Sequence, residues 1–208
     1  MSKKILVTGG AGYIGSFIVR GLKDSGFEPF IVDNLSSGHK TSVSEFPVIN
    51  IDLVADKAKL LKLFKKEKFI GVIHMASFIQ MGESFRDPSK YFNNNLISAI
   101  NLLDVMVASG TKFIVFSSSA GVYGNPDRLP IKEDFPKNPL NPYGETKLMI
   151  EKILHWYDLA YGLKFVAIRY FNAAGASLDG SIGEDHPNES HLIPLILKSA
   201  IEGNSFTV

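Results

Sequence analysis

Cysteine is absent from this 208-residue chain, and tryptophan occurs only once. Without cysteine the chain can form neither a disulfide nor a thiolate metal site, which fits a reducing compartment. The 22 Lys and Arg residues balance the 21 Asp and Glu residues, so no charge excess favours a nucleic acid or an anionic membrane. No apolar run is long enough to span a bilayer, and no signal peptide is visible. We therefore expect a cytoplasmic protein with no nucleic acid and no membrane among its partners.

Short apolar runs alternate with longer amphipathic stretches along the whole chain. We predict strands at 4–8, 28–32, 47–51, 69–74, 112–116 and 163–169, and helices at 12–25, 55–68, 89–109, 143–161 and 192–202. Strands that alternate with helices imply crossover connections, hence a parallel sheet covered on both faces. The expected fold class is α/β, a doubly wound parallel sheet of the Rossmann type. Two stretches rich in Pro, Gly, Asn and Asp, 124–142 and 173–190, are long enough to predict functional loops.

A glycine-rich turn follows the first predicted strand and opens the first predicted helix. Gly10, Gly12 and Gly15 satisfy the Gly-x-Gly-x-x-Gly spacing, and Gly9 with the last two satisfies a looser one. The backbone of such a turn approaches a pyrophosphate, and its helix packs closely on the strand. Asp33 ends the second strand, where a carboxylate accepts bonds from adenosine ribose hydroxyls and repels a 2′-phosphate. We therefore predict NAD rather than NADP as cofactor.

Tyr143 and Lys147 are four residues apart on a predicted helix and therefore share one of its faces. A lysine ammonium there can stabilise a tyrosine phenolate and so lower the pKa of the phenol. Alone, such a pair is more often a contact on a solvated surface. Ser119 ends the serine run after the fifth strand and can bond the same reacting oxygen, although a serine there also caps turns. Ser119, Tyr143 and Lys147 are the predicted catalytic residues.

Several other polar side chains attract attention. Asp52 ends the third strand and is as well placed to cap a turn as to reach an adenine. His74 ends a strand, where a lone histidine is more often structural than catalytic. His186 and His191 lie near acidic residues, but their spacing fits no zinc signature, so we predict no metal site.

The chain as a whole resembles a known family. The resemblance is carried by segments 7–16 (VTGGAGYIGS), 33–36, 82–84, 93–95, 117–124 (SSSAGVYG), 142–147 (PYGETK), 169–176 (RYFNAAGA), 183–186 and 191–194. It is a resemblance to the extended short-chain dehydrogenase/reductases that act on nucleotide sugars and, more narrowly, to the UDP-glucose 4-epimerase family. It implies interconversion of UDP-glucose and UDP-galactose by NAD-dependent oxidation at sugar C4, with a tyrosine base and a 4-keto intermediate.

The resemblance also implies which residues meet the ligands. The implied NAD contacts are Gly9, Gly12, Tyr13, Ile14, Gly15, Asp33, Asn34, Ser36, Asp52, Leu53, Met75, Ala76, Asn94, Ser117, Tyr143, Lys147 and Tyr170. The implied substrate contacts are Ser119, Tyr143, Asn172, His191 and Leu192. Ile79, Gly121 and His191 depart from residues that some family members carry, which affects fine contacts rather than the chemistry.

The resembling family continues past Val208, so we expect 1–172 to be an NAD-binding Rossmann domain and 173–208 the start of an incomplete, smaller substrate-binding domain. Residues 205–208 would begin a strand. The resemblance also implies a homodimer that pairs the helices at 89–109 and 143–161.

Two alternatives stay open for the activity. One is an epimerase of another UDP-sugar, N-acetylated or uronic, because the discriminating pocket would lie largely beyond Val208. The other is a truncated NAD-binding domain without turnover. A 4,6-dehydratase is disfavoured, because those enzymes place an Asp-Glu pair where this chain has Ala120 and Gly121.

Overall fold

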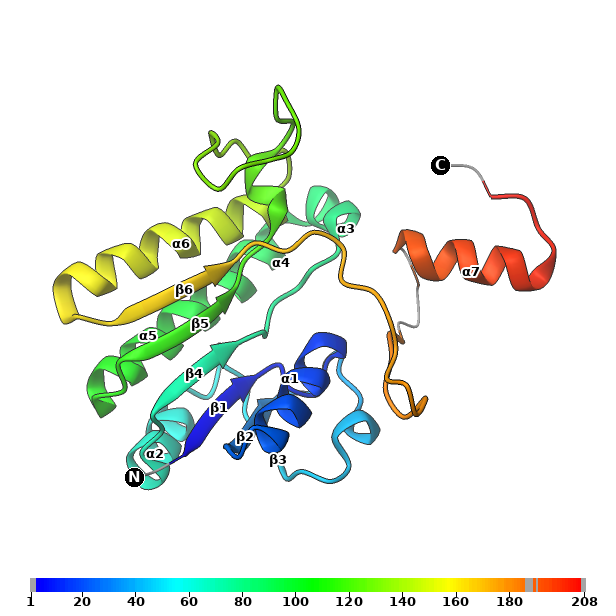
Figure 1. The fold of residues 1–208 in the computed structure, drawn as a ribbon. Coiled ribbons are helices and arrows are strands. Elements are labelled where there is room, and N and C mark those ends of the chain that lie inside the picture. Colours follow the sequence, from blue (N-terminus) through cyan, green and yellow to red (C-terminus); the bar gives the residue numbers. More distant parts are fainter. Residues whose placement is uncertain (1–2, 186–188, 190, 207–208) are drawn as a thin grey trace.

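Six parallel strands form the sheet of the computed structural model, which describes residues 3–185, 189 and 191–206. The strands are β1 (Lys4–Thr8), β2 (Glu28–Asp33), β3 (Val48–Asn50), β4 (Gly71–His74), β5 (Phe113–Ser117) and β6 (Lys164–Ile168). Their spatial order is β3-β2-β1-β4-β5-β6, and every neighbouring pair is parallel (Figure 1). The order reverses between β1 and β4, which is the switch point where such sheets bind ligands. The predicted Rossmann-type sheet is confirmed.

Helices cover both faces of this sheet (Figure 1). They are α1 (Tyr13–Asp24), α2 (Lys57–Glu67), α3 (Met81–Arg86), α4 (Pro88–Tyr91), α5 (Ile97–Ser109), α6 (Pro142–Tyr161) and α7 (Leu192–Glu202). On one face, α2, α5 and α6 contribute Leu60, Leu102 and Leu154 to the larger apolar core. On the other face, α1 packs Val19 against Val7 of β1 in a smaller core. The start of α6 and the turn before α1 both follow the carboxyl ends of parallel strands, so they lie at the same edge of the sheet.

The helix predicted at 89–109 is interrupted in the structure. It consists of α4, a π-helical turn (Phe92–Leu96) and α5. A π-turn inserts an extra residue and is common near functional sites. Here it turns the fully buried amide of Asn95 inward, where Oδ1 accepts from Phe78 N at 2.9 Å and Nδ2 donates to Thr146 Oγ1 at 3.1 Å. This amide ties the interrupted helix to the first turns of α6.

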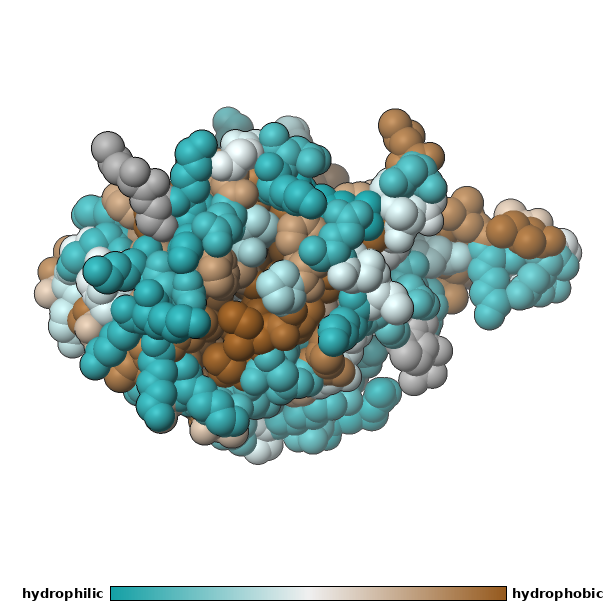
Figure 2. Space-filling view, turned by 90° about the horizontal axis from the view of Figure 1, so that it is seen from below, coloured by the Kyte–Doolittle hydropathy of each residue, from teal (hydrophilic) through white to brown (hydrophobic). Residues whose placement is uncertain are grey.

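The segment after β6 lacks regular structure until α7, as the composition of 173–190 predicts, although 186–188 and 190 lie outside the described residues. Helix α7 stands apart from the sheet and exposes Leu192, Ile193, Leu197 and Ile201 (Figures 1 and 2). The strand expected at 205–208 is absent at 205 and 206, and 207–208 lie outside the described residues. Across the described residues, no helix combines the length and apolarity that crossing a bilayer requires.

Two glycines before and within α1 are required by close backbone packing. A Cβ on Gly15 would lie 2.2 Å from the carbonyl oxygen of Gly9, and one on Gly9, whose φ is +69°, would lie 2.6 Å from Ala76 N. Gly12 differs, because a Cβ there would meet only Gly9 O, at 3.4 Å. Helix α1 thus packs tightly on the glycine turn at Gly15, while the surface at Gly12, the residue before the helix, stays open.

The substitution Gly15→Ala tests this packing. The added methyl group must displace main chain, so we expect the free energy of unfolding to fall by about 1–3 kcal/mol. Gly82→Ala in α3 is the matched control, because a Cβ there meets nothing within 4 Å and alanine favours a helix by about 1 kcal/mol. Urea unfolding measures both variants. Equal stability of the two would contradict the packing account.

Candidate active site

The ends of β5 and β6 and the first turns of α6 converge at one edge of the sheet. Ser117 is the last residue of β5, and Ser119 caps the 3₁₀ turn Ala120–Tyr123. Helix α6 begins with a proline, and the side chain of Asn141 accepts from Gly144 N at 2.7 Å, which caps the helix. Tyr143 and Lys147 lie one turn apart on its buried side, 9% and 1% exposed. The predicted shared face is confirmed.

Lys147 is held by two oxygen atoms. Its Nζ donates to Ser117 O and to Ser77 Oγ, both at 2.8 Å. It lies 5.6 Å from the ring centroid of Tyr143, so its charge acts on the phenol from beside the ring. Burial lowers the pKa of the Lys147 amine to about 7. At neutral pH the chain alone therefore keeps this amine only partly protonated.

The Tyr143 phenol is harder to ionise than a free tyrosine in this structure. Burial raises the pKa of Tyr143 to about 12, the Ser119 hydroxyl lowers it and Tyr170 raises it. The predicted lowering is therefore wrong for the polypeptide by itself, because removal of water outweighs the help from Ser119 and from an amine beside the ring. A base at neutral pH requires a further positive charge next to the phenol.

The turn-cap reading of Ser119 is confirmed, whereas its catalytic role stays a prediction. Its Oγ accepts from Gly121 N at 3.0 Å, which caps the following turn. The same hydroxyl interacts with the Tyr143 phenol. Because the cap uses Oγ as an acceptor, the hydroxyl hydrogen remains for donation to another oxygen.

The glycine turn provides a cradle for an anion. Gly12 caps α1 and has no side chain to satisfy the first N–H groups of the helix, which also lie at the positive end of its dipole. Tyr13 Oη donates to Gly175 O at 2.7 Å, so the segment after β6 passes this end of α1. Asp33 is 8% exposed and accepts from Ala11 N at 3.0 Å and Leu35 N at 2.8 Å. These features fit a dinucleotide pyrophosphate, with a carboxylate fixed near its ribose.

The remaining predicted cofactor residues gather at this same edge. Asp52 Oδ1 accepts from Val54 N and Ala55 N at 2.8 and 3.0 Å, so the turn-cap reading is confirmed. Its other oxygen accepts from Asn34 Nδ2 at 2.8 Å, a bond that lowers the pKa of Asp52. The adenine contact of Asp52 stays a prediction.

Other members of the predicted set differ in exposure and partners. Leu53 is buried in the larger core, and Ser36 is exposed. Met75 and Ala76 follow β4 beside Gly9. Asn94 lies on the π-turn, and its Nδ2 donates to Asn95 Oδ1 at 3.0 Å. Tyr170 Oη contacts Ser117 Oγ.

The residues expected to meet the substrate are spread more widely. Asn172 is exposed after β6, and Leu192 opens α7, apart from the sheet (Figure 1). His191 Nδ1 lies 2.6 Å from Glu184 and 3.2 Å from Glu189. These three side chains bring their ligand-type atoms within 4.8 Å of one another, whereas His186 lies outside the described residues. The substrate roles of Asn172, His191 and Leu192 stay predictions.

His74 is structural, as predicted. Its Nδ1 and Thr8 Oγ1 lie 2.7 Å apart, and its ring stacks on Phe116. Burial lowers the pKa of His74 to about 3, so the ring is neutral. This removes the histidine from proton transfer at neutral pH.

Sequence reasoning missed four polar residues beside the site: Ser77, Asn95, Glu151 and Arg169. Glu151 could have been found, because it is four residues after Lys147 and shares its helix face. Its partner Arg169 follows β6, so only the folded chain shows that the two meet, at 2.6 Å. Ser77 and Asn95 carry no sequence signal that distinguishes them from other loop and helix residues.

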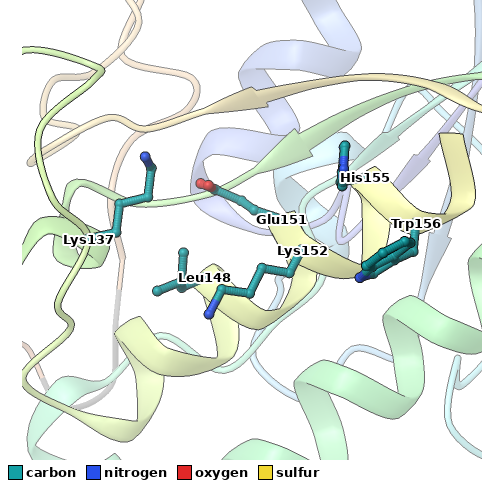
Figure 3. A pocket seen from close by; sticks show the side chains of 6 residues that line it. All are labelled: Lys137, Leu148, Glu151, Lys152, His155 and Trp156. Atoms are coloured by element: carbon teal, nitrogen blue, oxygen red, sulfur yellow. The ribbon is translucent and has the colours of Figure 1, made fainter. Parts of the chain in front are cut away.

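A hollow of about 330 Å³ lies on the outer side of α6. It is lined by Lys137, Leu148, Glu151, Lys152, His155 and Trp156 (Figure 3). Glu151 and Lys137 point toward each other across it (Figure 3). Neither Tyr143 nor Ser119 lines this hollow, so we assign it no part in the chemistry.

Comparisons with known proteins agree with this geometry. Residues 5–208 match the model of the NAD dependent epimerase/dehydratase family. The UDP-glucose 4-epimerase of Lactobacillus helveticus is 50% identical over 206 residues, 99% of this chain and 62% of the relative.

Solved structures show the same likeness. The UDP-glucose 4-epimerase of Brucella ovis in complex with NAD matches with a TM-score of 0.93 and 44% identity, over 96% of this chain and 61% of that one. The Bifidobacterium longum enzyme in complex with NAD+ and UDP matches with a TM-score of 0.88 and 37% identity, over 95% and 62%. The chain thus spans about three fifths of the length of these proteins. This chain belongs to the NAD dependent epimerase/dehydratase family.

Proposed function

We propose that this protein interconverts UDP-glucose and UDP-galactose as an NAD-dependent 4-epimerase. The observation that carries the proposal is the group formed by the buried Tyr143 and Lys147 with the half-buried Ser119, at the same sheet edge as the glycine turn. In this proposal 1–172 bind NAD and 173–208 begin the substrate-binding part. The absence of cysteine fits the cytoplasm as its location.

The roles of the side chains follow from their positions. Tyr143 as phenolate takes the proton of the sugar 4-hydroxyl and later returns it, while Ser119 donates a hydrogen bond to the same oxygen. A bound NAD⁺ would supply the hydride acceptor for C4 and the donor for its return, which inverts C4 because the 4-keto sugar would turn over between the two transfers. Lys147 holds a positive charge beside the phenol, and the Asp33 carboxylate receives the adenosine ribose.

The pKa of Tyr143 determines how strongly its phenolate must be stabilised for the residue to act as a base at neutral pH. Moving the pKa of Tyr143 from about 12 to near 7 requires about 7 kcal/mol of differential stabilisation. One unit charge at 4 Å supplies about 4 kcal/mol at an effective dielectric constant of 20. A single charge is therefore too weak. In this proposal the amine of Lys147, in its protonated form, and the positive nicotinamide ring act on the phenol together.

Removal of the phenolic oxygen tests the base. Tyr143→Phe should lower turnover of UDP-galactose by at least about 1,000-fold, because general base catalysis and hydrogen bonding to the sugar oxygen are lost together. Binding of NAD, measured by calorimetry, should change less than about threefold, since the ring remains. Ordinary turnover by this variant would remove Tyr143 from the proposed role.

The carboxylate at the end of β2 sets the preference for NAD. Asp33→Ala should weaken NAD binding and bring the Kd values of NAD and NADP closer by about tenfold, because repulsion of the 2′-phosphate is lost. The ratio of the two Kd values is the readout, because loosening of the turn at Ala11 affects both cofactors alike. An unchanged ratio would show that selectivity arises elsewhere.

A second reading, NAD binding without turnover by this chain, is favoured by the position of α7, which stands apart from α6 (Figure 1). Equilibrium dialysis with NAD, followed by assays with UDP-galactose and UDP-N-acetylgalactosamine side by side, separates the alternatives. Retained NAD with no turnover supports the binding module. Preferential turnover of the N-acetylated sugar supports an epimerase of another UDP-sugar.

We also propose a homodimer formed through α5 and α6. On these two helices Leu103 is buried and Ile153 packs against the core, whereas Ile100 and Trp156 are 37% and 66% exposed. Leu159, also on α6, is 64% exposed. Such exposed aromatic and aliphatic groups on adjacent helices are typical of an interface.

A charged residue at the centre of this surface tests the dimer. Trp156→Glu should weaken self-association at least about tenfold, because an unpaired charge would be buried, and sedimentation velocity measures it. Leu178→Glu, in an exposed loop, is the control and should leave the sedimentation coefficient unchanged. A dimer that persists in the Trp156 variant would place the interface elsewhere.

A further inference from the structure

A buried carboxylate lies behind the candidate active site and joins its segments. Glu151 is 8% exposed and one helical turn after Lys147. Its Oε1 accepts the Ser118 hydroxyl at 2.5 Å and Arg169 Nε at 2.8 Å. Its Oε2 accepts Arg169 Nη2 at 2.6 Å. The carboxylate thus bonds both to the end of β5 and to the residue after β6.

The hydrogen bond from Ser118 to Glu151 matters because of the two residues on either side of Ser118. Ser118 lies between Ser117, whose carbonyl holds Lys147, and Ser119, which meets Tyr143. Successive side chains of an extended strand point to opposite sides, and the Ser118 side chain, fully buried, is the one directed to Glu151. Helix α6, which carries Tyr143, is therefore bonded to the end of β5 through Glu151 and Ser118.

Arg169, the residue after β6, bonds to the same carboxylate and so links a third segment to α6. It precedes Tyr170, whose hydroxyl contacts Ser117. Its Nη1 donates to Tyr123 Oη at 2.7 Å and to Glu133 O at 3.1 Å, so it also holds the turn after Ser119. The bond to Glu151 raises the pKa of Arg169, so the guanidinium is charged. A two-pronged guanidinium–carboxylate contact fixes orientation as well as distance.

We propose that Glu151 and Arg169 are positioning residues that hold α6 in register with the ends of β5 and β6, so that Tyr143 meets Ser119. The inference rests on the proposed function. The groups that face the phenol are Ser119 after β5, Lys147 on α6, Tyr170 after β6 and Tyr91 on α4. Glu151 and Arg169 act through the placement of these groups.

Ionisation of Tyr143 in the NAD complex is the readout, because it requires no turnover. The near-ultraviolet absorbance of the full chain with bound NAD is titrated with and without Tyr143→Phe, and the difference reports this phenol alone. The same pair of titrations is made in a Glu151→Gln background. We expect the apparent pKa of Tyr143 to rise by about one unit or more in that background, since the Ser119 contact is misplaced.

Two further variants keep the test decisive. Ser118→Ala removes one hydrogen bond and leaves the Arg169 pair, so it should fold and shift the pKa of Tyr143 in the same direction by less. Tyr157→Phe is the matched control, because it removes a 2.5 Å bond from the same helix to Asp104, away from the site. It should leave the titration of Tyr143 unchanged.

The outcomes distinguish the inference from the function on which it rests. Absence of a Tyr143 phenolate near neutral pH in the unmodified NAD complex would overturn the proposed function and the inference with it. A phenolate that is present there and unmoved by Glu151→Gln or Ser118→Ala would overturn the inference alone. A loss of unfolding free energy without a shift in the pKa of Tyr143 would then identify the network as purely structural.

Discussion

The buried amine of Lys147 is the constraint on which the rest of this site depends. Moving a charged amine out of water is costly unless oxygen atoms replace its hydration, and here only Ser117 O and Ser77 Oγ bond to it. This cost lowers the pKa of Lys147 to about 7, and burial of the neighbouring phenol raises the pKa of Tyr143 to about 12. The polypeptide alone thus builds a site in which neither group carries its full charge. A positively charged ligand beside the phenol would favour the phenolate and so lower the pKa of Tyr143.

The backbone around the glycine turn also suits the binding of a dinucleotide. Gly15 lets α1 pack on the carbonyl of Gly9, and Gly9 lets the turn approach the main chain of Ala76, so closely that no side chain fits at either position. Gly12 leaves the first helical N–H groups uncovered. Asp33 fixes this turn through Ala11 N while standing at the expected place of the ribose. Because parallel strands present their carboxyl ends at one edge, the turn and the Tyr143 pair face a common ligand across the switch point of the sheet.

The sequence predicted the parts of this architecture that depend on local pattern. The strand at 4–8 and the helix at 192–202 have the predicted bounds, because a short apolar run ends before Gly9 and a longer apolar stretch ends before Gly203. The Tyr143–Lys147 face followed from helical periodicity. The π-turn around Asn95 could not be predicted, since it depends on partners at Phe78 and Thr146 that only tertiary structure brings together. The raised pKa of Tyr143 had the same origin, because burial is not written in the spacing of residues.

In the proposed complex with NAD⁺, the positive nicotinamide ring and the Lys147 amine flank the Tyr143 oxygen. A crystal structure of this chain with bound NAD⁺ tests it most directly. We expect the Tyr143 oxygen to face the hydride-accepting carbon of the nicotinamide, with room for one sugar carbon between them. Lys147 should remain next to the Tyr143 ring. A nicotinamide bound on the other side of the sheet edge, out of reach of Tyr143, would contradict it.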